Sequence, residues 1–183
     1  MNWLFRSGDK RDSTAAEIYA DIVALARQPR LYADLGVPDT VAGRFEMVLL
    51  HVAAALRRLE RGSEAERDLG QRVFDAFCDD MDASLREFGV GDAVMGKRMR
   101  KVGRSYFGRS QVYGEAFEAG DRAAMTSALG RNLFPDAGKD ATDGLADYAF
   151  RLRDAFDAVG AGAFEEGAKA VPRDIGEGAS GDD

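Results

Sequence analysis

Five carboxylates lie within one short stretch of the chain, and carboxylates can ligate divalent cations or work as acid–base pairs. They are Asp75, Asp79, Asp80, Asp82 and Glu87. Their spacing lacks the glycine-centred, alternating oxygen ligands of an EF-hand loop, and no Glu-x-x-His helix completes a di-iron bundle. We therefore expect a solvated acidic helix face with no metal and no cofactor. A helical metal- or ligand-binding domain that uses this acidic cluster is the alternative interpretation.

A basic segment follows the acidic one. Between Lys97 and Arg109 the chain has only cations among its charged residues: Lys97, Arg98, Arg100, Lys101, Arg104 and Arg109. The nearby Gly89, Gly91 and Gly96 resemble a phosphate loop superficially, but their spacing fits neither G-x-x-x-x-G-K-[ST] nor a strand-led G-x-G-x-x-G. A basic face of this kind binds RNA, anionic lipid or an acidic protein patch. Two oppositely charged segments joined by glycines predict a docking surface rather than a catalytic pocket.

The remaining reactive side chains occur singly. Cys78 has acids beside it, which raise the pKa of a thiol, so we expect a small buried side chain and not a nucleophile. His51 lies between Arg44 and Arg58 in the sequence, and cations are poor neighbours for a metal ion, so we expect a structural or surface role. A single cysteine permits no intramolecular disulfide, which indicates a reducing, cytoplasm-like compartment.

Composition sets the broad class. The 183 residues, 45% of them hydrophobic, suffice for one well-buried core. A net charge of −7 argues against DNA binding. The longest apolar run, 47–56, is interrupted by His51 and is far shorter than the roughly 20 residues of a membrane span. Trp3, Leu4 and Phe5 form too short an apolar run for a signal peptide, but beside nearby cations they are suited to peripheral contact with anionic lipid.

Apolar residues at helical spacing predict the elements that position these side chains. A first helix is expected over about 15–27, after a capping box formed by Thr14 and Glu17. A central core helix follows, capped by Asp39 or Thr40. No alternating strand of useful length occurs. We therefore predict an all-α fold, a single domain of about six or seven helices.

The two charged segments are expected to form consecutive helices. Ser63 and Glu66 make a second capping box, which opens the acidic helix. The chain then breaks at 89–91, and Asp92 is expected to cap the basic helix. Glycine within 107–109 predicts a kink or break in that helix.

The chain is expected to divide into three parts. An N-terminal arm covers 1–12 and the helical domain covers 13–160. From 161 to 183 the sequence becomes rich in Gly and Ala and then acidic. So few apolar side chains cannot offset the entropy of ordering this segment, which predicts a flexible, disordered acidic tail.

The same residues resemble a known family. The motifs that carry the resemblance fall in order between about 30 and 133, and include Leu35-Gly36-Val37-Pro38-Asp39-Thr40, Gly43-Arg44-Phe45-Glu46-Met47, Leu50-His51, Asp80-Met81-Asp82, Leu85-Arg86-Glu87, Gly89-Val90-Gly91-Asp92 and Gly108-Arg109. Together they resemble the ubiquinol-cytochrome c chaperone family, whose members assist assembly of the respiratory cytochrome bc1 complex. Where relatives usually have Tyr-Gly-Arg, this chain has Phe107-Gly108-Arg109.

The resemblance implies a helical protein without enzymatic activity that binds newly synthesised cytochrome b, and in mitochondria also a small helical partner protein and the ribosome. We expect a bacterial-type member in the cytoplasm or at the inner face of the cytoplasmic membrane, because no mitochondrial targeting segment is recognisable. A ribosome- or RNA-binding adaptor is the second alternative. The predicted partner-binding residues are Arg44, Asp80, Asp82, Arg86, Lys97, Met99, Lys101, Arg104, Tyr106, Phe107 and Arg109.

Overall fold

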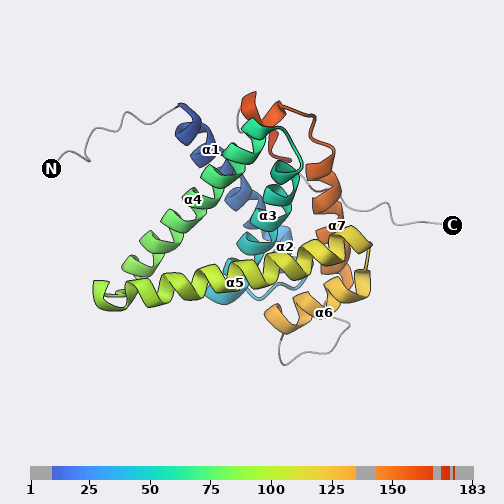
Figure 1. Cartoon of the computed structure of the whole chain (residues 1–183). Coiled ribbons are helices and arrows are strands. Elements are labelled where there is room, and N and C mark those ends of the chain that lie inside the picture. The colour runs from blue at the N-terminus through green and yellow to red at the C-terminus, as the bar shows by residue number, and fades with distance from the viewer. Residues whose placement is uncertain (1–9, 135–142, 167–169, 174, 176–183) are drawn as a thin grey trace.

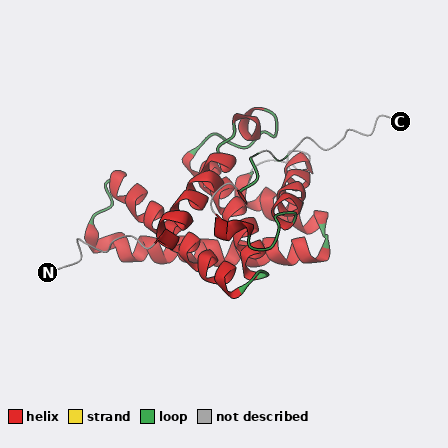
Figure 2. Ribbon diagram, turned by 90° about the horizontal axis from the view of Figure 1, so that it is seen from above, coloured by secondary structure: helices red, strands yellow, loops and turns green. Residues whose placement is uncertain are grey.

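The computed structural model describes residues 10–134, 143–166, 170–173 and 175, and within them the fold consists of seven α-helices and a short 3-10 helix. The helices are α1 (Lys10–Ala26), α2 (Pro29–Ala33), α3 (Val41–Glu60), α4 (Glu64–Glu87), α5 (Asp92–Ala119), α6 (Arg122–Leu133) and α7 (Asp143–Asp157), followed by η2 (Ala163–Glu166). No strand occurs in these residues (Figure 2). The predicted all-α class is confirmed.

The central helix of the fold is α3. Most of its side chains are buried, and α1, α4, α5, α6 and α7 all pack against it. Figure 1 shows α4 and α5 as two long arms of a V, with α3 between them. Thr40 begins this helix as predicted, since its Oγ1 accepts a hydrogen bond from the backbone N–H of Gly43 at 3.1 Å. A Cβ atom on Gly43 would overlap the carbonyl oxygen of Pro38, so the tight entry into α3 requires glycine.

The first helix begins earlier than its sequence signals indicate. It starts at Lys10, so Thr14 lies inside the helix and the predicted capping box does not mark its start. Asp12, in the first turn, forms an ion pair with Arg72 of α4, and Ile18 is fully buried. Packing along α4 and α3 therefore extends the helix by about one turn beyond the local signal.

The two long arms, α4 and α5, form a helical hairpin. Its first arm opens with the predicted capping box: the Ser63 hydroxyl accepts from the Glu66 backbone N–H, and the Glu66 carboxylate accepts from the Ser63 backbone N–H, both at 3.0 Å. The turn contains Gly89 at φ +77°, in the left-handed region that glycine adopts without strain. The second arm is capped by Gly91, and Asp92, the predicted cap, is its first helical residue instead.

The second arm of the hairpin continues without interruption from 92 to 119. The predicted break at 107–109 is therefore wrong. Tyr106 and Tyr113 are buried on either side of this segment, and both face the domain core. Their packing offsets the roughly 1 kcal/mol that a glycine such as Gly108 costs within a helix.

The described residues beyond 160 pack against the domain. Phe164 of η2 is fully buried and stacks on Phe156 of α7, with ring centroids 6.4 Å apart. Val171 and Ile175 are buried as well. The first part of the predicted flexible tail therefore contributes to the core. The rest of that tail, and the arm residues 1–9 with Trp3, Leu4 and Phe5, lie outside the described residues.

Candidate functional site

A row of exposed cations runs along α5, and we call it the basic face. It consists of Lys97, Arg98, Arg100, Lys101 and Arg104. At 100° per residue, Lys97, Lys101 and Arg104 lie on the side of the helix opposite the buried Met95 and Tyr106. None of the five forms an ion pair with any residue that the structure describes. The basic face therefore carries uncompensated positive charge.

The acids of α4 form no ion pair with the basic face in the described structure, and several of them have local partners instead. Asp82 pairs with Arg86 at 2.7 Å, and the same guanidinium binds Asp92 at 2.6 Å across the hairpin turn. Asp75 accepts from the Gln71 amide at 2.9 Å. Asp80 accepts from a tyrosine hydroxyl of α1. Among the described residues, the only ion pair between the two charged helices is therefore Arg86–Asp92 at the turn, and it involves no residue of the basic face.

Apolar side chains remain exposed on the hairpin. Phe88 and Val94, beside the turn, are 69% and 48% exposed, and Phe107 is 61% exposed. Met99 is half-buried. Phe107 and Met99 are among the predicted partner-binding residues, whereas Phe88 and Val94 are not. A sequence signal for them exists, because these two large apolar residues flank the glycines of the turn.

The aromatic residue next to Phe107 belongs to the core. Tyr106 is only 7% exposed, and its ring lies 4.8 Å from that of Phe74 and 5.8 Å from that of Phe77. Burial raises the pKa of its hydroxyl well above the ordinary value. Tyr106, which we predicted to contact a partner, therefore packs in the core of this structure. Phe107 packs at the edge of this cluster and keeps one side open.

Arg109 binds inside the protein. Its Nε donates to Glu46 of α3 at 2.6 Å, and Tyr113 donates to the same carboxylate oxygen at 2.7 Å. Asn132 of α6 donates to the Tyr113 hydroxyl at 3.0 Å, so the cluster joins α3, α5 and α6. Burial raises the pKa of Glu46, and the two donors act against that shift. Arg109 is a predicted site residue whose contacts stabilise the fold.

Arg44 makes its contacts away from the hairpin. Its Nε donates to Asp39 at 2.6 Å, and its guanidinium lies 5.7 Å from the centre of the Tyr32 ring. Both partners belong to the segment before α3. The hydrogen bond from Arg44 lowers the pKa of Asp39. Of the predicted site residues, the structure therefore groups Lys97, Lys101, Arg104 and Phe107 on the outside of α5, and it assigns Arg44, Tyr106 and Arg109 to other surroundings.

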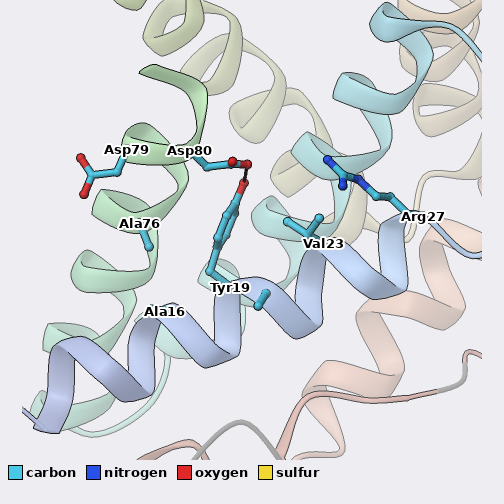
Figure 3. A pocket seen from close by; sticks show the side chains of 8 residues that line it. Ala16, Tyr19, Val23, Arg27, Ala76, Asp79 and Asp80 are labelled. Atoms are coloured by element: carbon cyan, nitrogen blue, oxygen red, sulfur yellow. Dashed lines mark hydrogen bonds between the residues drawn. The ribbon is translucent and has the colours of Figure 1, made fainter. Parts of the chain in front are cut away.

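A groove of about 480 Å³ lies between α1 and α4. Ala16, Ala20 and Val23 of α1 and Ala76 of α4 line it (Figure 3). The hydroxyl of Tyr19, also in the lining, donates to Asp80 at 2.7 Å and joins the two helices. Sequence reasoning missed this groove because it results from small side chains that belong to no motif. Alanine recurring every fourth residue on α1 is the signal that could have indicated it.

Two singly occurring side chains have buried surroundings. His51 is fully buried between the Met47 carbonyl, 2.7 Å from Nδ1, and the Tyr148 hydroxyl, 2.7 Å from Nε2. A carbonyl can only accept, so Nδ1 carries the proton and Tyr148 donates to Nε2. Burial lowers the pKa of His51 to about 4, so the ring is neutral at pH 7. The predicted structural role is confirmed. Cys78 is half-buried, and burial followed by the charges of neighbouring acids raises its pKa.

The described residues offer no group of three His, Cys, Asp or Glu side chains that could hold one metal ion. Among the same residues, no helix is sufficiently long and apolar to cross a bilayer. The fold and its surface define a helical protein with two charged arms. It has a basic face, exposed apolar side chains beside a turn, and a groove between helices. These are the features of a protein that docks other macromolecules.

Comparisons with known proteins agree with this class. The sequence profile of the family described as ubiquinol-cytochrome C chaperone matches residues 33–171, and the chain belongs to that family. A crystal structure of the Cbp3 homolog from Brucella abortus is similar, with a TM-score of 0.76 and 40% sequence identity over 86% of this chain and 88% of that chain. A comparison with curated proteins finds no match. The chain is thus a chaperone for assembly of the ubiquinol–cytochrome c reductase complex.

Proposed function

We propose that this chaperone binds newly synthesised cytochrome b through the basic face of α5 and the exposed apolar residues of the hairpin, without catalysing a reaction. The observation that carries the proposal is the row of five cations without ion-pair partners among the described residues, next to the exposed Phe88 and Val94. A newly made membrane subunit presents both apolar helices and charged loops, so it matches a surface with both properties.

The proposed client is a membrane protein, so we place the chaperone in the cytoplasm, at the inner face of the membrane when it meets the client. Exposed cations next to apolar side chains are compatible with this location, because the cytoplasmic leaflet carries anionic lipid. The exposed side chains at the hairpin turn are limited to a few, which suits reversible contact better than stable insertion.

Charge reversal on α5 tests the proposal. We expect the triple variant Lys97→Glu, Lys101→Glu, Arg104→Glu to capture less cytochrome b in a pull-down. Exposed ion pairs contribute about 0.5 kcal/mol each, so the loss of three weakens binding roughly tenfold. The matched control reverses three exposed arginines elsewhere: Arg67, Arg131 and Arg173. Both variants should keep the helical circular dichroism of the wild type.

The pull-down has a clear refuting result. Equal recovery of cytochrome b with wild type and the α5 triple variant would exclude the basic face as the binding site. Equal losses in the α5 and control variants would show a dependence on overall charge alone.

Sedimentation with ribosomes at increasing salt tests the adaptor alternative, since binding through phosphate contacts falls steeply with salt concentration.

A further inference from the structure

We propose that the groove between α1 and α4 is a second docking site, and that it binds a basic amphipathic segment of the client membrane protein. The inference rests on the proposed function for the identity of the client. It names the chemistry of the client segment and a surface separate from the basic face.

The floor of the groove is suited to close approach by a helix. Ala16 and Ala20 are exposed on α1, one helical turn apart, and Ala76 faces them from α4 (Figure 3). Their methyl groups leave an apolar furrow where larger side chains would fill the space between the helices. A second hollow of about 380 Å³ shares Ala16, Ala76 and Asp79 with the first, so the furrow continues toward the start of α1. From 12 to 27 along α1 its length is roughly 22 Å, about four helical turns.

The rims of this furrow are acidic. Its lining contains five aspartates and two arginines: Asp12, Asp68, Asp75, Asp79, Asp80, Arg27 and Arg72. One arginine, Arg72, is already bound to Asp12 and Asp68. Asp79 is exposed and has no ion pair within the described part of the chain, and Asp75 accepts only from an amide. An apolar floor between acidic rims favours a ligand with apolar side chains on one face and cations beside them.

One residue pair fixes the middle of the groove. The Tyr19 hydroxyl donates to Asp80 at 2.7 Å, so the carboxylate is held between the two helices (Figure 3). Burial, followed by this hydrogen bond, raises the pKa of Tyr19, which keeps the hydroxyl protonated as a donor. Asp79, the next residue, is exposed. The groove therefore has a fixed carboxylate at its centre and a solvated one at its rim.

Membrane proteins carry segments of the required kind. Their cytoplasmic loops and the ends of their transmembrane helices are enriched in Lys and Arg next to apolar residues. The basic face of α5 repels such segments, whereas the groove attracts them. The two surfaces are therefore complementary to different parts of one client. One wall of the groove, α1, precedes residue 33, where the match to the family profile begins, and the other wall, α4, lies inside the matched region.

Peptide binding tests the groove directly. The probe is a synthetic 18-residue amphipathic peptide with Lys on one face and Leu on the other, and its partner has Glu in place of every Lys. We expect the full-length protein to bind the Lys peptide, with at least tenfold weaker binding in Ala16→Leu, Ala20→Leu, which fills the floor without changing charge. The variant Asp75→Lys, Asp79→Lys should weaken binding similarly. The control Glu17→Lys, Glu64→Lys changes the charge equally outside the groove lining and should stay within twofold of the wild type.

Three results would overturn the inference. These are equal affinity for the Lys and Glu peptides, undiminished binding by the floor-filled variant, and concentration-dependent dimerisation that the floor-filled variant abolishes. The last would assign the groove to a second copy of the chain.

Pull-down of cytochrome b separates this inference from the proposed function. If wild type and both groove variants recover cytochrome b equally, the groove inference fails and the proposed function stands. If wild type recovers none, the proposed function fails, and the peptide titration still decides whether the groove binds a basic segment.

Discussion

Replacing Arg109 with methionine should destabilise the fold and leave the docking surfaces in place. Its guanidinium is bound to Glu46, whose side chain is 3% exposed, while its own side chain is 27% exposed. Methionine keeps the apolar length of the side chain and removes its charge. Among the described residues, Glu46 then retains only the Tyr113 hydroxyl, at 2.7 Å, as a side-chain donor. A buried carboxylate is left without its cation.

The size of the effect follows from the burial of this pair. Breaking a buried ion pair by removing one partner costs about 3–5 kcal/mol. Water reaches part of Arg109 and Tyr113 still donates, so we expect the lower end of the range, about 3 kcal/mol. For a chain of this size, 1 kcal/mol corresponds to roughly 2–4 °C, so the midpoint of thermal unfolding should fall by about 6–12 °C.

Urea unfolding followed by far-ultraviolet circular dichroism measures this loss. Arg104→Met is the matched control, because Arg104 is exposed on the same helix, and it should change the free energy of unfolding by less than about 0.5 kcal/mol. Glu46→Gln combined with Arg109→Met removes both charges and should recover part of the stability. An Arg109→Met protein as stable as wild type would refute the reasoning. Loss of cytochrome b capture at unchanged stability would return Arg109 to the binding surface.

Two further predictions concern the pH dependence of stability and the hairpin turn. The pKa of His51 is about 4 in the folded protein and near 6.5 when unfolded, so its contribution to stability is complete above pH 6.5 and is lost as pH falls toward 4. The free energy of unfolding should drop by about 2 kcal/mol between pH 7 and pH 5 from this group, and a His51→Asn variant that keeps the full pH dependence would contradict this. Gly89→Ala should cost about 1–2 kcal/mol because φ is +77°. Gly91→Ala, at φ −70° with open space around it, should cost less, about 0.5 kcal/mol, because only the N-cap preference for glycine over alanine is lost. Equal unfolding midpoints in urea would show that the turn carries no strain.

Local signals in the sequence predicted much of the fold. The Ser63–Glu66 capping box, the cap at Thr40 and the glycine turn after α4 all act through neighbours a few residues away, so a sequence pattern can identify them. The start of α1 could not be predicted in this way. It depends on packing against α4, including the contact from Asp12 to Arg72, which lies 60 residues further along the chain.

The candidate site shows the same division. The run of cations between Lys97 and Arg109 correctly predicted an exposed basic face at Lys97, Lys101 and Arg104. It could not distinguish them from Arg109, because the charge of an arginine does not indicate its partner, and Glu46 lies 63 residues away. The groove was missed for a different reason. A furrow forms where small side chains leave space unfilled, and its depth depends on how the two helices pack against each other.

The junction between α1 and α2 meets the C-terminal end of the described chain at one corner of the molecule. The Gln28 side chain donates to the Arg173 carbonyl at 2.9 Å, and Arg30 donates to the Ile175 carbonyl at 3.0 Å, in each case across 145 residues. Arg58 likewise donates to the Val159 carbonyl at 2.9 Å. Synthesis proceeds from the N-terminus, so these early donors stay without their acceptors until the segment beyond α7 has been made. This corner of the fold therefore closes only after all seven α-helices of the described chain have been synthesised.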